Sequence, residues 1–169
     1  MKRLILLACF LVYSYSNAQP PVIELQPYGF DPIVVTIPDT SNEKLIELSK
    51  NWALNYNSEE GADVTEITQN SMVITALKRN AFYYRNDGVP YDHMIQYTMK
   101  LVFSQNSYRL VLTVDDIYNN DDKLIKYKIP DYFNSDGDLK EGYEQIRPSL
   151  ETTVNNMVKS HYNFLINFR

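Results

Sequence analysis

The sequence predicts one α+β domain: an antiparallel sheet with two helices on one face. Three patterns indicate this class: strict alternation of apolar residues between Tyr91 and Tyr118, a helical repeat after residue 40, and another near the C-terminus. Strands joined by tight turns pair as antiparallel neighbours, and two amphipathic helices need an apolar sheet face to cover. With 169 residues, the chain is long enough to bury a core of its own.

The first 18 residues, 1–18, are a predicted signal peptide. A basic start precedes an apolar run, and Ser16-Asn17-Ala18 fits the small-x-small rule, so we expect cleavage after Ala18. Cys9 ends a stretch that resembles a bacterial lipobox, but the apolar run before it is short, and we favour cleavage after Ala18 over lipidation. Cleavage there removes the only cysteine and with it disulfides and thiol catalysis.

Charge and hydropathy limit the kinds of partner that the mature chain can bind. Loss of the signal leaves 14 basic and 21 acidic residues, a net charge of −7. Nucleic-acid binders need basic surface, so we expect no nucleic-acid partner. No later stretch reaches the roughly 18 apolar residues of a membrane span. We therefore expect an exported protein of the periplasm or cell envelope of a Gram-negative bacterium, with no span in the mature chain.

The first elements follow from composition and spacing. Residues 19–29 carry three prolines and predict an extended leader outside the core; residues 30–169 form the predicted domain. Phe30–Ile37 alternates as a strand. Thr40-x-x-Glu43 is a capping-box pattern before a helix, whose apolar stripe comprises Leu45, Leu48, Trp52 and Tyr56.

Four strands and a second helix follow. We expect strands at Val64–Thr68 and Met72–Tyr84, then a turn at residues 85–90 in which Pro90 blocks continuation, then the hairpin 91–118. The polar segment 119–134 crosses an edge of the domain or holds a short strand at Leu124–Ile129. A final helix begins near Pro148, and a short helical turn within 138–146 is an option.

Five stretches of local sequence are distinctive: EKLIELSKNWALNY, SMVITALKRNAFYYRNDG, SYRLVLTVDDIY, DYFNSDGDLKEGY and PSLETTVNNMV, which are spread along the predicted domain 30–169. Through them the chain resembles a family of secreted bacterial domains of unknown function with a TATA-binding-protein-like (TBP-like) fold. The resemblance implies the order β-α-β-β-β-β-α. It does not imply DNA binding, because fold alone does not carry function and the acidic balance opposes it.

The sheet face opposite the helices is the predicted binding surface. The polar-side residues of the hairpin, which alternate with the apolar set, are Gln96, Thr98, Lys100, Arg109, Val111 and Thr113. The preceding strand is expected to add Val73, Thr75, Leu77 and Arg79. A threonine-rich, mixed surface of this kind suits docking of an envelope protein or a small ligand. A plain solvated face is the alternative.

Each of the other candidate sites also has a purely structural interpretation. Phe82-Tyr83-Tyr84 is a stacking platform for carbohydrate or peptide, or a half-buried strand end. His161 lies on the apolar stripe of the last helix, which predicts a buried histidine with one satisfied partner; His93 lies beside Asp92. Asp115-Asp116 should point to opposite faces and end their strand, so they make no acid–base pair.

The sequence predicts no metal site and no cofactor. Asn134-Ser135-Asp136-Gly137-Asp138 hints at a calcium loop, but with Gly137 sixth, tyrosines occupy the first and twelfth positions, so we expect a turn. A nonstandard calcium site stays open. The expected function is a non-enzymatic binding or envelope-associated module. The alternatives are a small periplasmic hydrolase using His93 with a carboxylate and a structural envelope subunit; the sequence leaves oligomeric state open.

Overall fold

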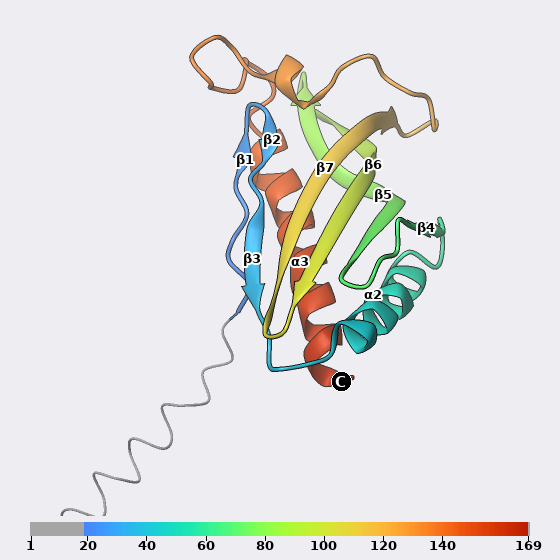
Figure 1. Cartoon of the computed structure of the whole chain (residues 1–169). Coiled ribbons are helices and arrows are strands. Elements are labelled where there is room, and N and C mark those ends of the chain that lie inside the picture. The colour runs from blue at the N-terminus through green and yellow to red at the C-terminus, as the bar shows by residue number, and fades with distance from the viewer. Residues whose placement is uncertain (1–18, 169) are drawn as a thin grey trace, which may run out of the picture.

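The structure, a computed structural model, describes residues 19–168; the predicted signal peptide 1–18, with Cys9, lies outside the described residues. Within residues 19–168, two helices, one short 3-10 helix and seven strands follow one another (Figure 1). In chain order they are β1 (Leu25–Gln26), β2 (Gly29–Phe30), β3 (Ile33–Thr36), α2 (Asn42–Tyr56), β4 (Ala62–Thr65), β5 (Ser71–Asn86), β6 (Val89–Ser104), β7 (Ser107–Asn119), η2 (Ile129–Tyr132) and α3 (Ile146–Asn167).

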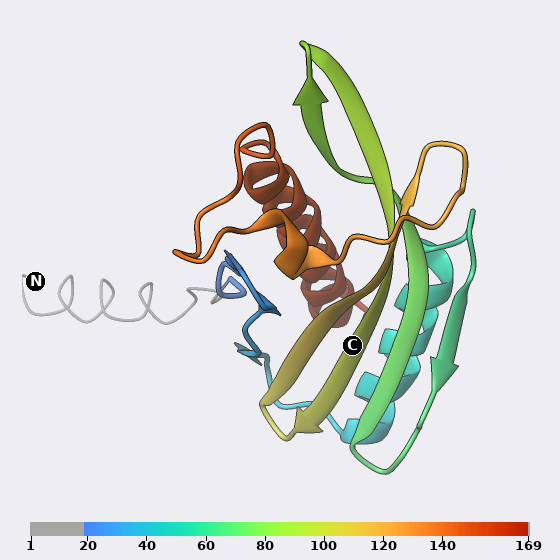
Figure 2. The ribbon, with the colours of Figure 1, turned by 90° about the horizontal axis from the view of Figure 1, so that it is seen from above.

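The main sheet is antiparallel throughout, with strand order β3-β7-β6-β5-β4. The predicted hairpin is confirmed as β6 and β7, and the predicted order of strand, helix, four strands and helix is confirmed from β3 to α3. Pro90, however, does not block a strand: it pairs with Arg85 inside the β5–β6 hairpin, whose end projects beyond the other strands (Figure 2). The turn contracts to Asp87-Gly88, which both have positive φ.

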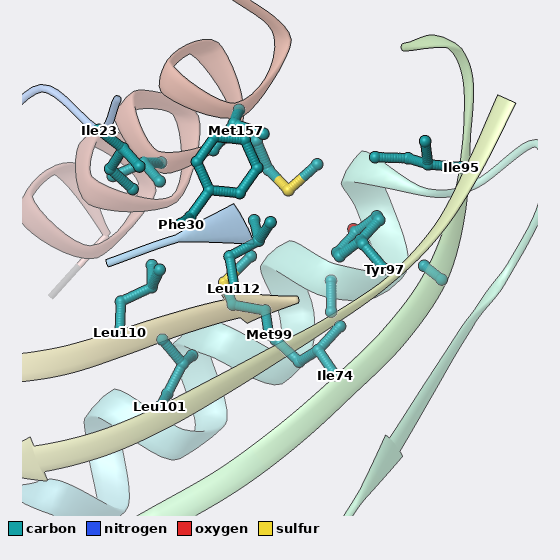
Figure 3. Packing of buried hydrophobic residues seen from close by; sticks show 14 of the residues in the cluster. Ile23, Phe30, Ile74, Ile95, Tyr97, Met99, Leu101, Leu110, Leu112 and Met157 are labelled. Atoms are coloured by element: carbon teal, nitrogen blue, oxygen red, sulfur yellow. The ribbon is translucent and has the colours of Figure 1, made fainter. Parts of the chain in front are cut away.

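Both helices pack on the same face of the sheet, as predicted. Their apolar stripes meet the inward residues of the central strands in one cluster; Figure 3 shows Tyr97, Met99, Leu101, Leu110 and Leu112 in this layer beside Ile23, Phe30 and Met157. The predicted stripe of α2 is buried at Leu45, Leu48 and Trp52. Its N-cap is Ser41 rather than Thr40, because the Ser41 hydroxyl accepts the hydrogen bond from the Lys44 amide.

The prediction that residues 19–29 lie outside the core is wrong. Ile23 and Leu25 are 2% and 1% exposed, and β1 and β2 form a small hairpin beside β7 and α3. The α3 side chain of Asn155 accepts from the Ile23 amide and donates to its carbonyl, both at 2.8 Å, and Glu151 accepts from the Leu25 amide at 2.8 Å. Prolines prevent a long strand here, and α3 supplies the missing hydrogen bonds.

The segment between β7 and α3 has little regular structure. Of the two alternatives for this segment, the short strand at Leu124–Ile129 does not form: one bridge, Tyr118 to Leu124, is followed by η2. Residues 138–145 form turns rather than a helical turn, and α3 begins at Ile146, so Pro148 is its third residue, not its first. The predicted turn at 134–138 is confirmed: the Asn134 side chain accepts from the amides of Asp136 and Asp138 at 2.9 and 3.0 Å.

Candidate functional site

The six predicted surface residues lie together on the outer face of the sheet. Register pairs Thr98 with Thr113 and Lys100 with Val111, directly across β6 and β7. Lys100, Arg109 and Thr113 are exposed, whereas Thr98, Val111 and Gln96 are half-buried. The alternation that buries Tyr97, Met99 and Leu101 against the helices leaves this set facing away from them. We call the outer side of β4–β7 the outer face.

A hollow of about 600 Å³ opens on the outer face towards β4. Gln96 is the one member of the predicted six in its lining. The strand residues Thr75, Leu77 and Arg79, expected on this face, also line it. Tyr118 and Asp122 close the side towards the end of β7. The hollow therefore combines apolar surface with hydroxyl, amide and charged groups.

Arg79 links the two sides of the hollow. Its guanidinium bonds Glu60, next to β4, and Asp122, in the turn after β7, with 2.8 Å between Nη1 and the Asp122 carboxylate. The hydrogen bond and charge of Arg79 lower the pKa of the Asp122 carboxyl. Because all three side chains reach solvent, the network adds little to the free energy of unfolding. Its effect is to fix a cation beside the apolar surface.

Thr98 links β6 to both neighbouring strands on the outer face through its hydroxyl group. Its hydroxyl donates to Asp115 at 2.6 Å and lies 3.2 Å from that of Thr75, which donates in turn. A bulge opposite Gln96 and Tyr97 makes Asp115 the extra residue of β7. The prediction that Asp115 and Asp116 point to opposite faces and end the strand is therefore wrong: both are on the outer side, and β7 continues to Asn119.

Lys128 forms a salt bridge with one member of this acidic pair. Its ammonium contacts the carboxylate of Asp116 at 2.5 Å and also donates to the backbone carbonyl of Asp115. The pair thus has a salt bridge on one member and a threonine hydroxyl on the other. Each carboxylate therefore has a partner of its own, and the two do not share one.

The same bulge explains why the alternation pattern did not place Tyr118 on the outer face. Counting by twos from Tyr108 places Tyr118 on the buried face, but the extra residue reverses the parity, so Ile117 is buried instead. The Tyr118 hydroxyl then donates to the Gln96 side chain at 3.3 Å on the outer face. Glu60 and Asp122 were missed because loops bring them to the hollow.

The two histidines have different surroundings. His161 is fully buried, with Ser49 Oγ at 2.9 Å from Nε2 and the Tyr108 hydroxyl at 3.2 Å from Nδ1, so it has two partners where one was predicted. Burial lowers its pKa to about 3. No substrate reaches this serine–histidine pair, since Ser49 is also 0% exposed.

His93 is 5% exposed and borders a separate cavity under the β5–β6 hairpin. Burial also lowers the pKa of His93. Among the described residues, the lining of that cavity includes no aspartate or glutamate, which a hydrolase of the kind considered above requires. Within residues 19–168 no three potential ligands gather for a metal ion. No helix in that range has the length and apolar character of a membrane span.

Two solved structures resemble this arrangement. A TBP-like protein from Parabacteroides distasonis matches with a TM-score of 0.59 and 18% sequence identity, over 81% of this chain and 92% of the other. The fold is TBP-like. A DUF4468 family protein from Bacteroides ovatus matches with a TM-score of 0.50 and 10% identity, over 92% of this chain and 87% of the other.

Sequence comparison gives no further relatives. No protein-family model matches the chain, and no curated protein matches it. At 18% and 10% identity, the two structures establish the TBP-like fold alone, and they assign no activity to this chain. The function of this TBP-like domain must therefore be argued from its own surface.

Proposed function

We propose that this TBP-like protein is an exported, non-enzymatic binding module whose outer sheet face contacts a protein of the cell envelope. The observation that carries the proposal is the composition of the outer face. Exposed Lys100, Arg109 and Thr113 surround half-buried Val111, beside a hollow that adds Leu77 and Tyr118. Apolar groups framed by hydrogen-bonding groups are typical of protein contact surfaces.

The surroundings of the histidines and acidic residues favour binding over catalysis. His161 is closed off from solvent, the cavity beside His93 lacks a carboxylate among its described residues, and Asp115 and Asp116 are each satisfied by a neighbour. Export rests on the predicted cleavage after Ala18. Five of the six predicted residues lie along β6 and β7 outside the hollow, so the outer face as a whole suits a protein better than a small molecule in the hollow alone.

The test is crosslinking of the purified protein to the envelope of the producing cell, followed by capture. The double variant Lys100→Glu/Thr113→Arg changes two exposed outer-face side chains that make no hydrogen bond within residues 19–168, so the fold should persist. We expect one saturable partner of the wild-type protein, lost in this variant. Thr98 is left unchanged because its hydrogen bonds to Thr75 and Asp115 support the sheet.

A matched control places the same changes on the opposite side of the molecule. Lys159→Glu/Thr152→Arg alters exposed positions of α3 with the same net change of charge. This control should retain the partner. Capture that is equal for both double variants contradicts the outer-face proposal. Concentration-dependent self-association that is lost only in the outer-face variant also contradicts it, because the face would then bind a second copy of the chain.

A further inference from the structure

An aromatic cavity of about 350 Å³ lies between the projecting end of the β5–β6 hairpin (Figure 2) and the segment after β7. Tyr84, Tyr91 and His93 line it from the hairpin, and Tyr127 and Tyr132 from the later segment. It is distinct from the outer-face hollow: the two linings share no residue. Its volume is at the lower end of the roughly 300–1,000 Å³ usual for small-molecule sites.

The hairpin wall is a stack of rings set by strand pairing. Phe82 pairs with His93, and Tyr84 pairs with Tyr91. The first pair has ring centroids 4.9 Å apart and an interplanar angle of 5°, and the second has 5.6 Å and 15°. Tyr84 also stacks on His93 at 5.1 Å, so the rings form one continuous series. Its outer member, Tyr91, is 44% exposed.

The facing wall is held by perpendicular contacts. Tyr127, 51% exposed, meets the buried ring of Tyr132 at 77°. Tyr143 braces both walls, because its ring packs edge-on against Tyr84 at 5.0 Å and Tyr132 at 5.1 Å. The exposed rings are therefore supported from behind by others, which reduces the side-chain entropy lost when a ligand binds.

The polar groups of the lining are neutral or positive. His93 Nδ1 lies 2.9 Å from the backbone carbonyl of Tyr91; a carbonyl only accepts, so Nδ1 carries the hydrogen and Nε2 is left as an acceptor. Burial lowers the pKa of His93, which keeps the ring neutral near pH 7. Asn119 adds its side-chain NH2 group, since its side-chain oxygen already accepts from the amides of Asp121 and Lys123, and Lys126 adds an ammonium group. Tyrosine hydroxyls complete the set.

We propose that this aromatic cavity binds a sugar ring. The C–H face of a pyranose packs on exposed tyrosine rings, while its hydroxyls exchange hydrogen bonds with tyrosine, Asn119 and Lys126. A quaternary ammonium ligand would face the charge of Lys126 with no carboxylate among the described lining residues to offset it. An acyl chain would leave the amide and hydroxyl groups without partners. This site is independent of the outer-face proposal.

Isothermal titration calorimetry of the purified protein tests the proposal. The probes are cellohexaose, maltohexaose, chitohexaose and mannohexaose, with adenosine as a flat aromatic comparison. We expect saturable binding of at least one oligosaccharide. Tyr91→Ala and Tyr127→Ala should each weaken it about 3- to 10-fold, since each removes one stacking surface. Both side chains are largely exposed, so the thermal midpoint should barely change.

Phe168→Ala is the matched control. Phe168 is an exposed aromatic, 62% exposed, at the far end of α3 from the cavity, and its loss should leave sugar affinity unchanged. The proposal fails if none of the four oligosaccharides binds, or if the double variant Tyr91→Ala/Tyr127→Ala binds as the wild type does. Binding of adenosine without any sugar also overturns it, because the cavity would then recognise planar rings.

Discussion

His161 makes the free energy of unfolding depend on pH. Its imidazole is enclosed by Ser49, Tyr108 and the edge of Trp52, whose ring centroid lies 4.9 Å away. Burial without an acidic neighbour lowers its pKa to about 3, against 6.5 for the free side chain. The folded protein therefore keeps His161 neutral at a pH where the unfolded chain binds a proton. His161 therefore takes almost nothing from the free energy of unfolding at pH 7 and destabilises the fold increasingly as pH falls from about 6.5 towards 3.

We predict that His161→Gln reduces the loss of stability between pH 7 and pH 5. Each unit below about pH 6.5 should cost the wild type about 1.4 kcal/mol through this group, whereas glutamine does not titrate. Urea unfolding of both proteins at several pH values measures the difference in slope. Burial lowers the pKa of His93 as well, so the variant His93→Gln is measured beside it to separate the contributions of the two histidines to the slope. Equal slopes for wild type and His161→Gln would contradict the buried, neutral state of His161.

Individual residues also show what the sequence could and could not provide. The buried position of His161 was predictable from helical spacing, since Val154, Met157, Val158 and Leu165 define the stripe on which it lies. Its second partner, Tyr108, was not, because that contact joins residues 53 positions apart. The role of His93 depends on a cavity whose far wall comes from a segment without periodicity.

The first hairpin, β1–β2, is held to the rest of the fold largely by side chains of α3. We predict that Asn155→Ala, which removes the side chain bonded to both backbone groups of Ile23, releases this segment. Leaving these part-buried groups unpaired should cost about 1–3 kcal/mol. Hydrogen exchange at Ile23 and Leu25 and limited proteolysis within residues 19–26 should both increase. The neighbouring exposed Asn156 provides the control, and similar effects of Asn156→Ala would contradict the role of Asn155.

Periodicity separates the elements that were predictable from those that were not. The alternation in β6 and β7 is long enough to identify strands, faces and pairing, and the stripe of α2 is equally regular. β1 and β2 are two residues each and rich in neighbouring prolines, so no period exists. The bulge at Asp115 inserts one residue into a regular pattern, and single-residue register changes leave no mark in composition. The outer face was therefore predictable up to the bulge, whereas Tyr118, Glu60 and Asp122, which complete the lining of the hollow, were not.

The charge of the whole chain argues against DNA binding by this TBP-like fold. The full sequence has a net charge of −5 and a pI of about 5.0. On the outer side, the cations Arg79, Lys100, Arg109 and Lys128 are matched in number by the carboxylates of Glu60, Asp115, Asp116 and Asp122. Binding to a DNA backbone needs several phosphates neutralised by basic side chains, which this balance does not supply.

We predict no retardation of a 30-base-pair duplex DNA in a gel-shift experiment at 50 mM salt, even at micromolar protein. Low salt favours any electrostatic attraction, so it is the most demanding condition for this prediction. A charge variant that replaces Asp115, Asp116 and Asp122 with asparagine shows whether acidity is the barrier. A salt-sensitive shift with the wild-type protein would contradict the prediction.

The bond between Ile23 and Asn155 spans 132 positions, and it has a consequence for the order of events during synthesis. The ribosome releases the N-terminal hairpin before α3, and α3 brings eight buried residues to the core. Until α3 has been made, α2 is the one helix of residues 19–168 that covers the apolar side of the sheet. A fold that closes when α3 arrives keeps the nascent chain incompletely folded, a state compatible with export under the signal peptide that the sequence predicts.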